Sequence, residues 1–407
     1  MVGKRVIVAL SGGVDSTVAA LLMKSAGHWV KGVFMHNWDE LDETGHCNAE
    51  QEYRAVQNIC HRLDMPCSKV TFVKEYWNNV FSEMLTDYQV GLTPNPDIWC
   101  NERIKFGALL QHINMTSGAD LIATGHYARV KHDGKVVTLN VFLLAHNHGG
   151  YRADTFTLDL QVHGEPCTYV CGNYWRVWTS IRIKPTFSQP YLRFCACQQR
   201  VLENVLFPVG NLKKTEVKQI AIDAGFADVA AKKESMGLCF VGRRKFSNFI
   251  KEYIGCQTGL FVTLDGKVVG QHSGHMYYTI GQRSGLSLDN SAYYVASKNV
   301  QTNEIVVVPG PHHDALYCNM FYTHQPHWIS GGNPITVKNF QCTVKDRRGP
   351  ISTRCIVSEQ GGGLQVVAAK NPFRAVTPGQ YAVFYDDNEC LGAAVISGPG
   401  PSLIDIK

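Results

Sequence analysis

The sequence predicts an α/β protein in which a doubly wound parallel sheet is followed by a small central domain and a C-terminal antiparallel β-barrel. Residues 1–130 alternate strand and helix patterns, as a parallel sheet requires. An amphipathic helix pattern follows at Lys213–Gly225, and short apolar stretches separated by Gly, Pro and Asn continue from Gly259 onward. Of the 407 residues, 45% are hydrophobic and 18% charged, so the chain can bury a sizeable core and wholesale disorder is excluded.

The first expected strand is Arg5–Leu10, a short apolar run bounded by Ser-Gly-Gly, as is typical of a buried central strand. A helix is expected next, at 16–26, because its apolar residues have helical spacing and Gly27 follows as a stop. Such alternation places ligands at the carboxyl ends of the strands. The remaining strands are expected at 29–34, 68–73 and 119–123, and the remaining helices at 49–63, 76–89 and 104–115.

Changes of pattern divide the chain into four parts. The parallel sheet occupies 1–130, the central domain 199–258 and the barrel 259–407. Residues 131–198 carry four His and four Cys but show neither a strand nor a helix period, so we interpret them as an atypical insert or as a stretch such as a retained intron. The CxxxC and CxC spacings in this stretch differ from the usual zinc-binding pairs, and no metal site is predicted.

The overall charge and the cysteines narrow the class of protein. A net charge of +5 permits a polyanionic partner without requiring one. The fourteen cysteines include no CxxC pair. Their wide spacing favours free thiols in a reducing compartment over a disulfide framework. No apolar run approaches the ~20 residues that cross a bilayer, so no membrane partner is expected. Neither a secretory signal nor an Arg-rich transit peptide is expected from the first residues.

The strongest motif is Ser11–Ser16, with the sequence SGGVDS, between the first strand and the first helix. Two glycines allow successive backbone N–H groups to converge on an anion, and the helix N-terminus adds positive potential. Asp15 is suited to holding Mg²⁺ or orienting phosphates. No Lys follows the glycines, so this is not the phosphate loop of GxxxxGK[ST] proteins. The motif resembles the pyrophosphatase loop of N-type ATP pyrophosphatases, which cleave ATP between the α and β phosphates and adenylate a substrate. This resemblance implies an adenylating enzyme.

Two further motifs each carry a cysteine. In Thr93–Asn101, TPNPDIWCN, two prolines stiffen the loop that presents Asp97 and Cys100. In 234–242, ESMGLCFVG, Cys239 has basic neighbours that favour a thiolate and attract nucleic-acid phosphate. Each alone is compatible with a structural turn and a buried thiol. Together with adenylation, they favour a reaction in which ATP activates an oxygen and sulfur then displaces AMP.

These motifs together resemble the tRNA-specific 2-thiouridylases of the N-type ATP pyrophosphatase superfamily. The resemblance runs through 1–130 and 199–400, and the stretch from Met35 to Asp39 is most similar to the animal mitochondrial branch. It implies an N-type pyrophosphatase domain, a central tRNA-binding domain and a barrel. The motifs that carry it are SGGVDS, Gly32–Met35, TPNPD with Cys100 and Asn101, Ala123–Arg129, ESMGLCFVG and Tyr278–Arg283.

The resemblance implies roles for individual residues. Asn95, Pro96 and Asp97 face the target uridine at the wobble position of tRNA, with Asp97 as the acid/base. Cys239 carries a persulfide and attacks C2 of the adenylated uridine. Cys100 then attacks the persulfide and AMP leaves, with a Cys100–Cys239 disulfide as product, or free hydrosulfide acts instead. The implied ATP-binding residues are Ala9, Leu10, Ser11, Gly12, Gly13, Val14, Asp15, Ser16, Met35 and Gly125.

The same resemblance implies ATP and Mg²⁺, tRNAs of the Lys, Glu and Gln type, a sulfur-relay protein that donates persulfide, and a mitochondrial location. His126 is interpreted either as a phosphate ligand or as a structural residue. Other functions stay open from the sequence. They are another adenylating enzyme of this superfamily, such as a lysidine synthetase or an amidotransferase-type synthetase, and an RNA-binding module without thiolation activity. Because residues 131–198 replace part of the family's tRNA-contacting stretch, we expect the chain to bind ATP but to thiolate tRNA poorly.

Overall fold

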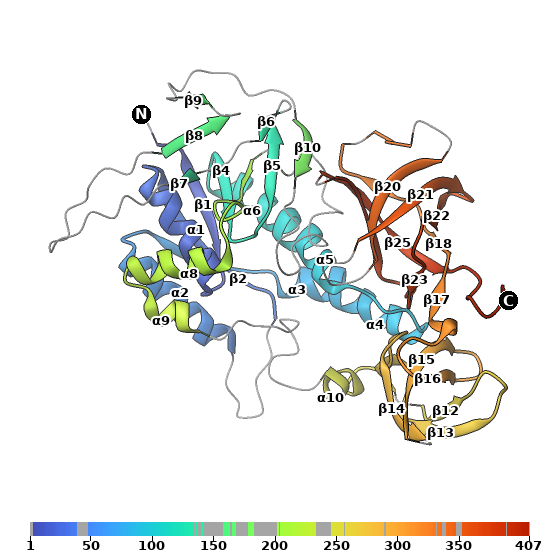
Figure 1. Cartoon of the computed structure of the whole chain (residues 1–407). Helices are drawn as coiled ribbons and strands as arrows, with labels where there is room; N and C mark the ends of the chain where they lie inside the picture. The colour runs from blue at the N-terminus through green and yellow to red at the C-terminus, as the bar shows by residue number, and fades with distance from the viewer. Residues whose placement is uncertain are drawn as a thin grey trace. The chain divides into compact units, whose positions relative to one another are not determined.

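The computed structural model of the chain describes residues 3–38, 48–132, 135–136, 140–141, 158–162, 165–167, 178–182, 202, 204–232, 246–255, 257–288, 290–330, 332–335, 339–346, 352–387 and 389–406. The chain forms two units. The first comprises Met1–Tyr76, Asn101–Pro185 and Cys197–Phe240, and the second comprises Trp77–Cys100, Thr186–Ala196 and Val241–Lys407. Figure 1 shows the elements of each unit.

The first unit is built on a five-stranded parallel sheet with the strand order β11-β4-β1-β2-β3. Its central strand has a nearly continuous apolar sequence, RVIVAL, because both of its faces are covered. The doubly wound parallel sheet predicted from the sequence is confirmed. The strands are β1 (Arg5–Leu10), β2 (Trp29–His36), β3 (Cys67–Thr71), β4 (Leu121–Thr124) and β11 (Val205–Leu206).

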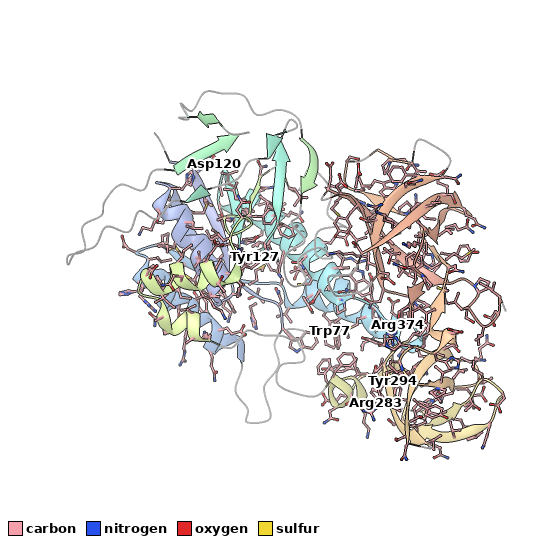
Figure 2. All side chains as sticks on the ribbon, viewed as in Figure 1. Trp77, Asp120, Tyr127, Arg283, Tyr294 and Arg374 are labelled. Atoms are coloured by element: carbon pink, nitrogen blue, oxygen red, sulfur yellow. The ribbon has the colours of Figure 1, made fainter. Side chains whose placement is uncertain are left out.

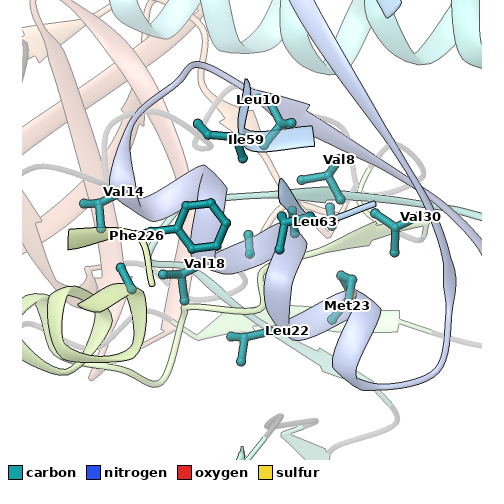
Figure 3. Close-up of a cluster of buried hydrophobic side chains, with 14 of the residues drawn as sticks. Val8, Leu10, Val14, Val18, Leu22, Met23, Val30, Ile59, Leu63 and Phe226 are labelled. Carbon is teal, nitrogen blue, oxygen red and sulfur yellow. The ribbon is translucent and has the colours of Figure 1, made fainter. Parts of the chain in front are cut away.

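Helices cover this sheet and complete its core (Figure 3). Phe226 is buried in the same cluster as Val18 of the first helix, and the Arg62 guanidinium lies 4.0 Å from the centre of the Phe226 ring. Arg62 also donates to both carboxylate oxygens of Asp228 at 3.0 Å, which joins two helices. The helices are α1 (Val14–Ser25), α2 (Asn48–Arg62), α3 (Val73–Tyr76), α6 (Leu109–Thr116), α8 (Lys214–Asp223) and α9 (Ala227–Ala231).

Two helical stretches differ from the expected bounds. Helical backbone runs from Val73 to Gln89 and includes the π-helix η1 (Trp77–Phe81). The helix expected at 104–115 begins earlier, at α5 (Pro96–Trp99), and continues through the nine-residue π-helix η2 (Cys100–Ala108) into α6. Pro96 allows this early start. Backbone N–H groups in the first turn of a helix have no partner within the helix, so a proline, which has no N–H, is tolerated there.

The second unit contains a helical part and two β assemblies. In the helical part, the Phe81 ring of η1 lies 5.7 Å from the Phe249 ring and 4.9 Å from the Tyr253 ring. The ring of Trp77, which Figure 2 labels, lies 6.1 Å from that of Tyr253. These rings bind η1 to the segment that carries Phe249. The helices of this part are η1, α4 (Ser82–Gln89), α5 and α10 (Phe246–Lys251).

The first β assembly of the second unit is a five-stranded sheet with the order β13-β12-β16-β15-β14. Phe261, Val295, Ile305 and Val307 form its buried core. All of its strand pairs are antiparallel except β12 with β16, which is parallel. The strands are β12 (Gly259–Val262), β13 (Val268–His272), β14 (Arg283–Leu288), β15 (Ser291–Asn299) and β16 (Glu304–Pro309), with a 3₁₀ turn, η4, at His275–Tyr277.

The second β assembly is a six-stranded antiparallel barrel, in the order β18-β22-β21-β20-β24-β25, that closes through the pairing of β18 with β25. Phe321, Phe373 and Phe384 are fully buried inside it. The predicted antiparallel barrel is confirmed. Its elements are η5 (Asp314–Leu316), β17 (Tyr317–Cys318), β18 (Met320–Thr323), β19 (His327–Trp328), β20 (Phe340–Lys345), β21 (Thr353–Gln360), β22 (Gly363–Ala368), β23 (Phe373–Arg374), β24 (Tyr381–Asp386) and β25 (Glu389–Pro399).

Short strands occur where the sequence shows no regular period. β5 pairs with β10 and with β6, and β8 pairs with β7 and with β9, all antiparallel. Within the described part of the chain, no helix has the length and apolar character needed to span a membrane. These strands are β5 (Arg129–His132), β6 (Lys135–Val136), β7 (Asn140–Val141), β8 (Leu158–Val162), β9 (Glu165–Cys167) and β10 (Trp178–Arg182).

Candidate active site

The loop between β1 and α1 forms a closed turn that is held by its own serines. The backbone N–H of Ser11 donates to Ser16 Oγ at 3.3 Å, and Ser16 Oγ donates to the Gly13 carbonyl at 3.1 Å. Thr17 Oγ1 donates to the same carbonyl at 2.9 Å. Gly12 has a φ of +75°, which glycine adopts without strain. The turn therefore leads directly into the N-terminus of the twelve-residue helix α1, where anions bind favourably.

Asp15 of this loop is held by a lysine and a tyrosine from distant parts of the chain. Lys214 Nζ contacts both carboxylate oxygens of Asp15 at 2.8 Å. Tyr127, which Figure 2 labels, donates from Oη to Asp15 Oδ1 at 2.6 Å. Both side chains of the ion pair are about a third exposed, at 31% and 32%, so they are open to a ligand in solvent. The loop thus has an anchored carboxylate and a cation beside the helix N-terminus.

Lys214 is a site residue that was not predicted from the sequence. The sequence does contain an indication of this role, because two lysines stand at the start of the helix α8, Lys213 as its N-cap and Lys214 as its first residue. Positive charge in a first helical turn is unfavourable to the helix dipole, so it calls for another partner. Asp15 is that partner for Lys214, although the two residues are 199 positions apart.

Gly125 lies against the loop at the end of β4. A Cβ at Gly125 would lie 2.5 Å from the Ser16 backbone nitrogen and 2.6 Å from the Asp15 carbonyl carbon. Only a glycine allows β4 and α1 to approach this closely. The neighbouring His126 bonds to Thr124 Oγ1 at 2.9 Å through Nδ1, and its ring lies 5.9 Å from Phe106. These contacts favour the structural interpretation of His126.

Other predicted nucleotide residues lie at the same sheet edge. Ala9 and Leu10 end β1, and Met35 is half-buried near the end of β2. Because the strands are parallel, their carboxyl ends meet at this edge, together with Gly125. Lys232 Nζ adds a second cation, 3.5 Å from the Gly12 carbonyl.

The helix α2 borders the same loop. A Cβ at Gly12 would lie 3.7 Å from the Glu52 carbonyl oxygen. Burial raises the pKa of the Glu52 carboxyl, and the positive charge of Lys232 opposes that rise. Glu52 therefore takes up a proton more readily than a glutamate with an ordinary pKa.

The second group of predicted residues lies on one segment, Thr93–Cys100, in the other unit. Gln380 Nε2 donates to the Thr93 carbonyl at 2.7 Å and to the Pro94 carbonyl at 3.3 Å. The Thr93 N–H donates to the Pro378 carbonyl at 2.9 Å, and Trp99 Nε1 donates to Tyr381 Oη at 3.0 Å. The barrel segment 378–381 thus fixes both ends of the loop, and sequence analysis missed Gln380.

This fixed segment presents an amide, a carboxylate and a thiol. Asn95 is 5% exposed, and its Oδ1 has no hydrogen-bond partner among the described residues. Asp97 is half-buried in the first turn of α5. Cys100 is 6% exposed and begins the π-helix η2, a rare backbone form that is frequent at functional sites. Asn95, Pro96, Asp97 and Cys100 thus share one short segment that is fixed by the barrel.

Cys239 and the rest of the segment 234–242 lie outside the described residues. The described parts of the chain hold no group of three or more His, Cys, Asp and Glu side chains suited to a metal ion. The loop at Ser11–Ser16 and the segment Thr93–Cys100 belong to different units, and each is complete in its own local contacts.

Three family models match the chain in order. The tRNA methyl transferase HUP domain matches residues 4–148 and 183–243, the tRNA methyl transferase PRC-barrel domain matches 247–309, and the aminomethyltransferase beta-barrel domain matches 318–396. The HUP model covers both parts of the parallel-sheet unit that carry Asp15 and Lys214. The other two models match the five-stranded sheet and the closed barrel.

Named relatives match along almost the whole chain. The mitochondrial tRNA-specific 2-thiouridylase 1 of Gallus gallus is 38% identical over 420 residues, which cover all of this chain and 94% of the relative. The tRNA-specific 2-thiouridylase MnmA of Staphylococcus aureus, strain bovine RF122 / ET3-1, is 39% identical over 394 residues, which cover 96% of this chain and 95% of the relative. With this identity over the full length, the chain belongs to the tRNA-specific 2-thiouridylase family.

Proposed function

We propose that the protein catalyses the ATP-dependent 2-thiolation of the wobble uridine of tRNA. One observation carries most of the proposal. The Ser11–Ser16 loop has the Asp15–Lys214 pair at a helix N-terminus, an arrangement suited to the phosphates of ATP, and the same chain holds Cys100 on a loop fixed by the barrel. The names of its relatives support thiolation over a lysidine synthetase, an amidotransferase-type synthetase or an RNA-binding module without activity.

The loop residues fit a nucleotide and a magnesium ion. Ser11, Gly12 and Gly13 offer a turn with little side chain, where phosphate can approach the backbone. Asp15 is the carboxylate that would hold Mg²⁺, and Lys214 is the cation that would meet the phosphates. The metal supplies neutralisation of charge on the departing pyrophosphate. The remaining residues in this role are Ala9, Leu10, Val14, Ser16, Met35 and Gly125.

The Thr93–Cys100 segment fits the uridine. The unpartnered Oδ1 of Asn95 is an acceptor, and uridine N3–H is a donor that complements it. Pro96 fixes the backbone beside it, and Asp97 takes or gives a proton as the C2 oxygen is adenylated and pyrophosphate leaves. To bind here, the uridine base must turn out of the stack of neighbouring bases. Enzymes that react with a base commonly bind it in this flipped-out state.

Sulfur transfer is assigned to two thiols. Cys239 carries a persulfide, whose terminal sulfur forms a bond to C2 of the adenylated uridine. Cys100 then attacks the inner sulfur, the S–S bond of the persulfide breaks, and AMP leaves with the former C2 oxygen. The product is 2-thiouridine and a Cys100–Cys239 disulfide, which an external thiol must reduce. In the alternative route, free hydrosulfide supplies the sulfur.

We infer the partners and the location from the same assignment. The substrates are tRNAs of the Lys, Glu and Gln type, and a sulfur-relay protein donates the persulfide. The mitochondrial name of the Gallus gallus relative supports a mitochondrial location. Three statements stay predictions. They are the division of the chain into four parts at residues 130, 198 and 258, the poor tRNA thiolation expected because of residues 131–198, and the role of Cys239.

Mass spectrometry of tRNA nucleosides tests the proposed function. Purified protein, ATP, Mg²⁺, a persulfide donor and unmodified tRNA are expected to give 2-thiouridine at the wobble position, with one AMP and one pyrophosphate released per thiolated uridine. Omission of tRNA is expected to stop pyrophosphate release. Lysidine, or another product formed through an adenylated intermediate, in place of 2-thiouridine would contradict the proposal.

The barrel contact gives a prediction for Gln380. In Gln380→Ala the Thr93 and Pro94 carbonyls lose their donor, so the loop that carries Asp97 loosens. Misplacement of a reacting group by about 1 Å can lower a rate about a hundredfold. We therefore expect kcat for thiolation to fall by ~10- to 100-fold. KM for ATP should not change. Gln341→Ala, an exposed glutamine of the same barrel, is the control. Equal kcat in both variants would show that Gln380 does not position the loop.

A further inference from the structure

The described residues contain two pairs of neighbouring thiols that the proposed reaction does not use. Cys60 and Cys67 belong to the parallel-sheet unit, and Cys342 and Cys355 belong to the barrel. In the barrel pair the sulfurs are 3.6 Å apart on directly paired residues of β20 and β21. The two pairs differ in their surroundings, because Cys342 and Cys355 are both buried whereas Cys67 is half-buried.

Cys60 and Cys67 are brought together by a short turn between α2 and β3. The Met65 N–H donates to the Cys60 carbonyl at 3.0 Å, which folds the chain back. Cys67 then pairs with Gly32 of β2, and a Cβ at Gly32 would lie 2.7 Å from Cys60 Sγ. Residues that pair across parallel strands point to the same face, so Cys67 shares the face of the sheet on which Cys60 Sγ meets Gly32. Both thiols therefore lie at one point of the sheet, next to a glycine that leaves room for them.

The exposure of the two thiols is unequal. Cys60 is 1% exposed, whereas Cys67 is half-buried and begins β3, which is the edge strand of the sheet. A small oxidant from solvent can therefore reach Cys67 first. Cys60 lies behind it, in the position of a resolving thiol.

Hydrogen bonds and charge favour the thiolate at Cys67. The hydrogen bond from Cys60 lowers the pKa of the Cys67 thiol, burial opposes this, and a hydrogen bond from Tyr53 and the charge of Lys31 lower the pKa further. The same hydrogen bond, with burial, raises the pKa of Cys60. The pair thus has one thiolate-prone sulfur and one protonated sulfur.

The barrel pair lacks these features. Cys342 and Cys355 are 9% and 1% exposed, and they belong to the apolar core of the barrel. The hydrogen bond to Cys342 and burial raise the pKa of the Cys355 thiol. This pair is therefore a matched control within the same molecule, since its sulfurs are close but both thiols are buried in an apolar core.

We propose that Cys67 and Cys60 form a redox modification site that reacts with peroxides and closes to a reversible disulfide. The Cys67 thiolate attacks one peroxide oxygen, the O–O bond breaks, and hydroxide leaves and takes up a proton as water. Cys67 is then a sulfenic acid, oxidised by two electrons. Cys60 sulfur attacks Cys67 sulfur, the S–O bond breaks, and the second water leaves with the Cys60 proton. One peroxide is reduced to two waters for each disulfide.

Peptide mapping of the full chain tests this proposal. The protein is reduced, freed of reductant, treated with hydrogen peroxide for increasing times, alkylated and digested with trypsin. Cleavage after Arg62 separates Cys60 from Cys67, and cleavage after Arg354 places Cys342 and Cys355 on different peptides. Since peroxide can reach the half-buried Cys67 while both barrel thiols are buried, we expect linked peptides of Cys60 and Cys67 to form at least ~10-fold faster than those of the barrel pair.

Two variants separate the steps. In Cys60→Ser, Cys67 is expected to stop at the sulfenic acid, which dimedone traps. In Cys67→Ser, Cys60 is expected to stay reduced at the same peroxide dose. Thiol reductant should restore both wild-type thiols. Equal rates for the two pairs, linkage of Cys67 to another cysteine, or oxidation of Cys60 in Cys67→Ser would overturn the proposal. None of these results depends on thiolation activity, so the site and the proposed function can fail separately.

Discussion

Lys214→Met is expected to reduce tRNA-dependent pyrophosphate release by about a hundredfold or more. Lys214 Nζ lies 2.8 Å from both oxygens of Asp15, beside the N-terminus of α1. When phosphates enter the loop, this ammonium is the mobile cation best placed to balance the charge that develops on pyrophosphate. Loss of one such donor typically costs about 10²–10³ in kcat. Pyrophosphate release is measured with saturating tRNA and ATP.

Lys213→Met is the matched control, because Lys213 is the preceding residue and its side chain is exposed. An ion pair that is about a third exposed contributes about 1 kcal/mol or less to stability, so both variants should unfold near the wild-type temperature. If Lys214→Met and Lys213→Met release pyrophosphate at the same rate, Lys214 serves only to hold Asp15.

The parallel-sheet unit was predictable because its signals are local. The apolar run Arg5–Leu10, the glycines after it and the helical spacing that follows each depend on neighbouring residues. The same holds for the segment Thr93–Cys100, whose prolines bring Asn95, Asp97 and Cys100 together over a few residues. Features that depend on neighbouring residues can be predicted from the sequence without knowledge of the tertiary contacts.

The partners that hold these motifs were not predictable, because each depends on a contact between distant positions. Lys214 meets Asp15 across 199 residues, and Gln380 meets Thr93 across 287. The strand β11 has only two residues, so it has no period to detect, yet it extends the sheet beyond β4. The π-helix η2 gives a period that neither helical nor strand templates match.

For the strands after Gly259, the type of strand pairing could be predicted from the sequence, but the partner of each strand could not. Short apolar stretches at close spacing, with Gly, Pro and Asn between them, predicted antiparallel pairing, and pairing of that kind dominates both assemblies. The pattern does not specify which strand pairs with which, because each strand buries one face whether it joins a sheet or a barrel. Closure through β18 and β25 joins residues at opposite ends of the barrel sequence.

Cys100→Ser is expected to abolish 2-thiouridine formation while tRNA-dependent pyrophosphate release continues. Cys100 acts only after adenylation in the proposed order, and its thiol is the group that breaks the persulfide S–S bond. A serine hydroxyl at the same position is far less able to attack sulfur. The reaction should therefore stop with persulfide on Cys239, which cyanolysis detects, and with 2-thiouridine measured by mass spectrometry at the level of a reaction without enzyme.

Cys318→Ser is the control for loss of a buried thiol in the same unit. Cys318 is 4% exposed, and burial raises the pKa of its thiol to about 11, so it is protonated and inert near neutral pH. This variant should keep thiolation. Two residues that act in one sequence of steps are strongly non-additive, so Cys100→Ser combined with Cys239→Ser should lose no more thiolation than either alone. Thiolation by Cys100→Ser at the wild-type rate would instead favour free hydrosulfide as the sulfur source, because that route needs no second thiol to break a persulfide.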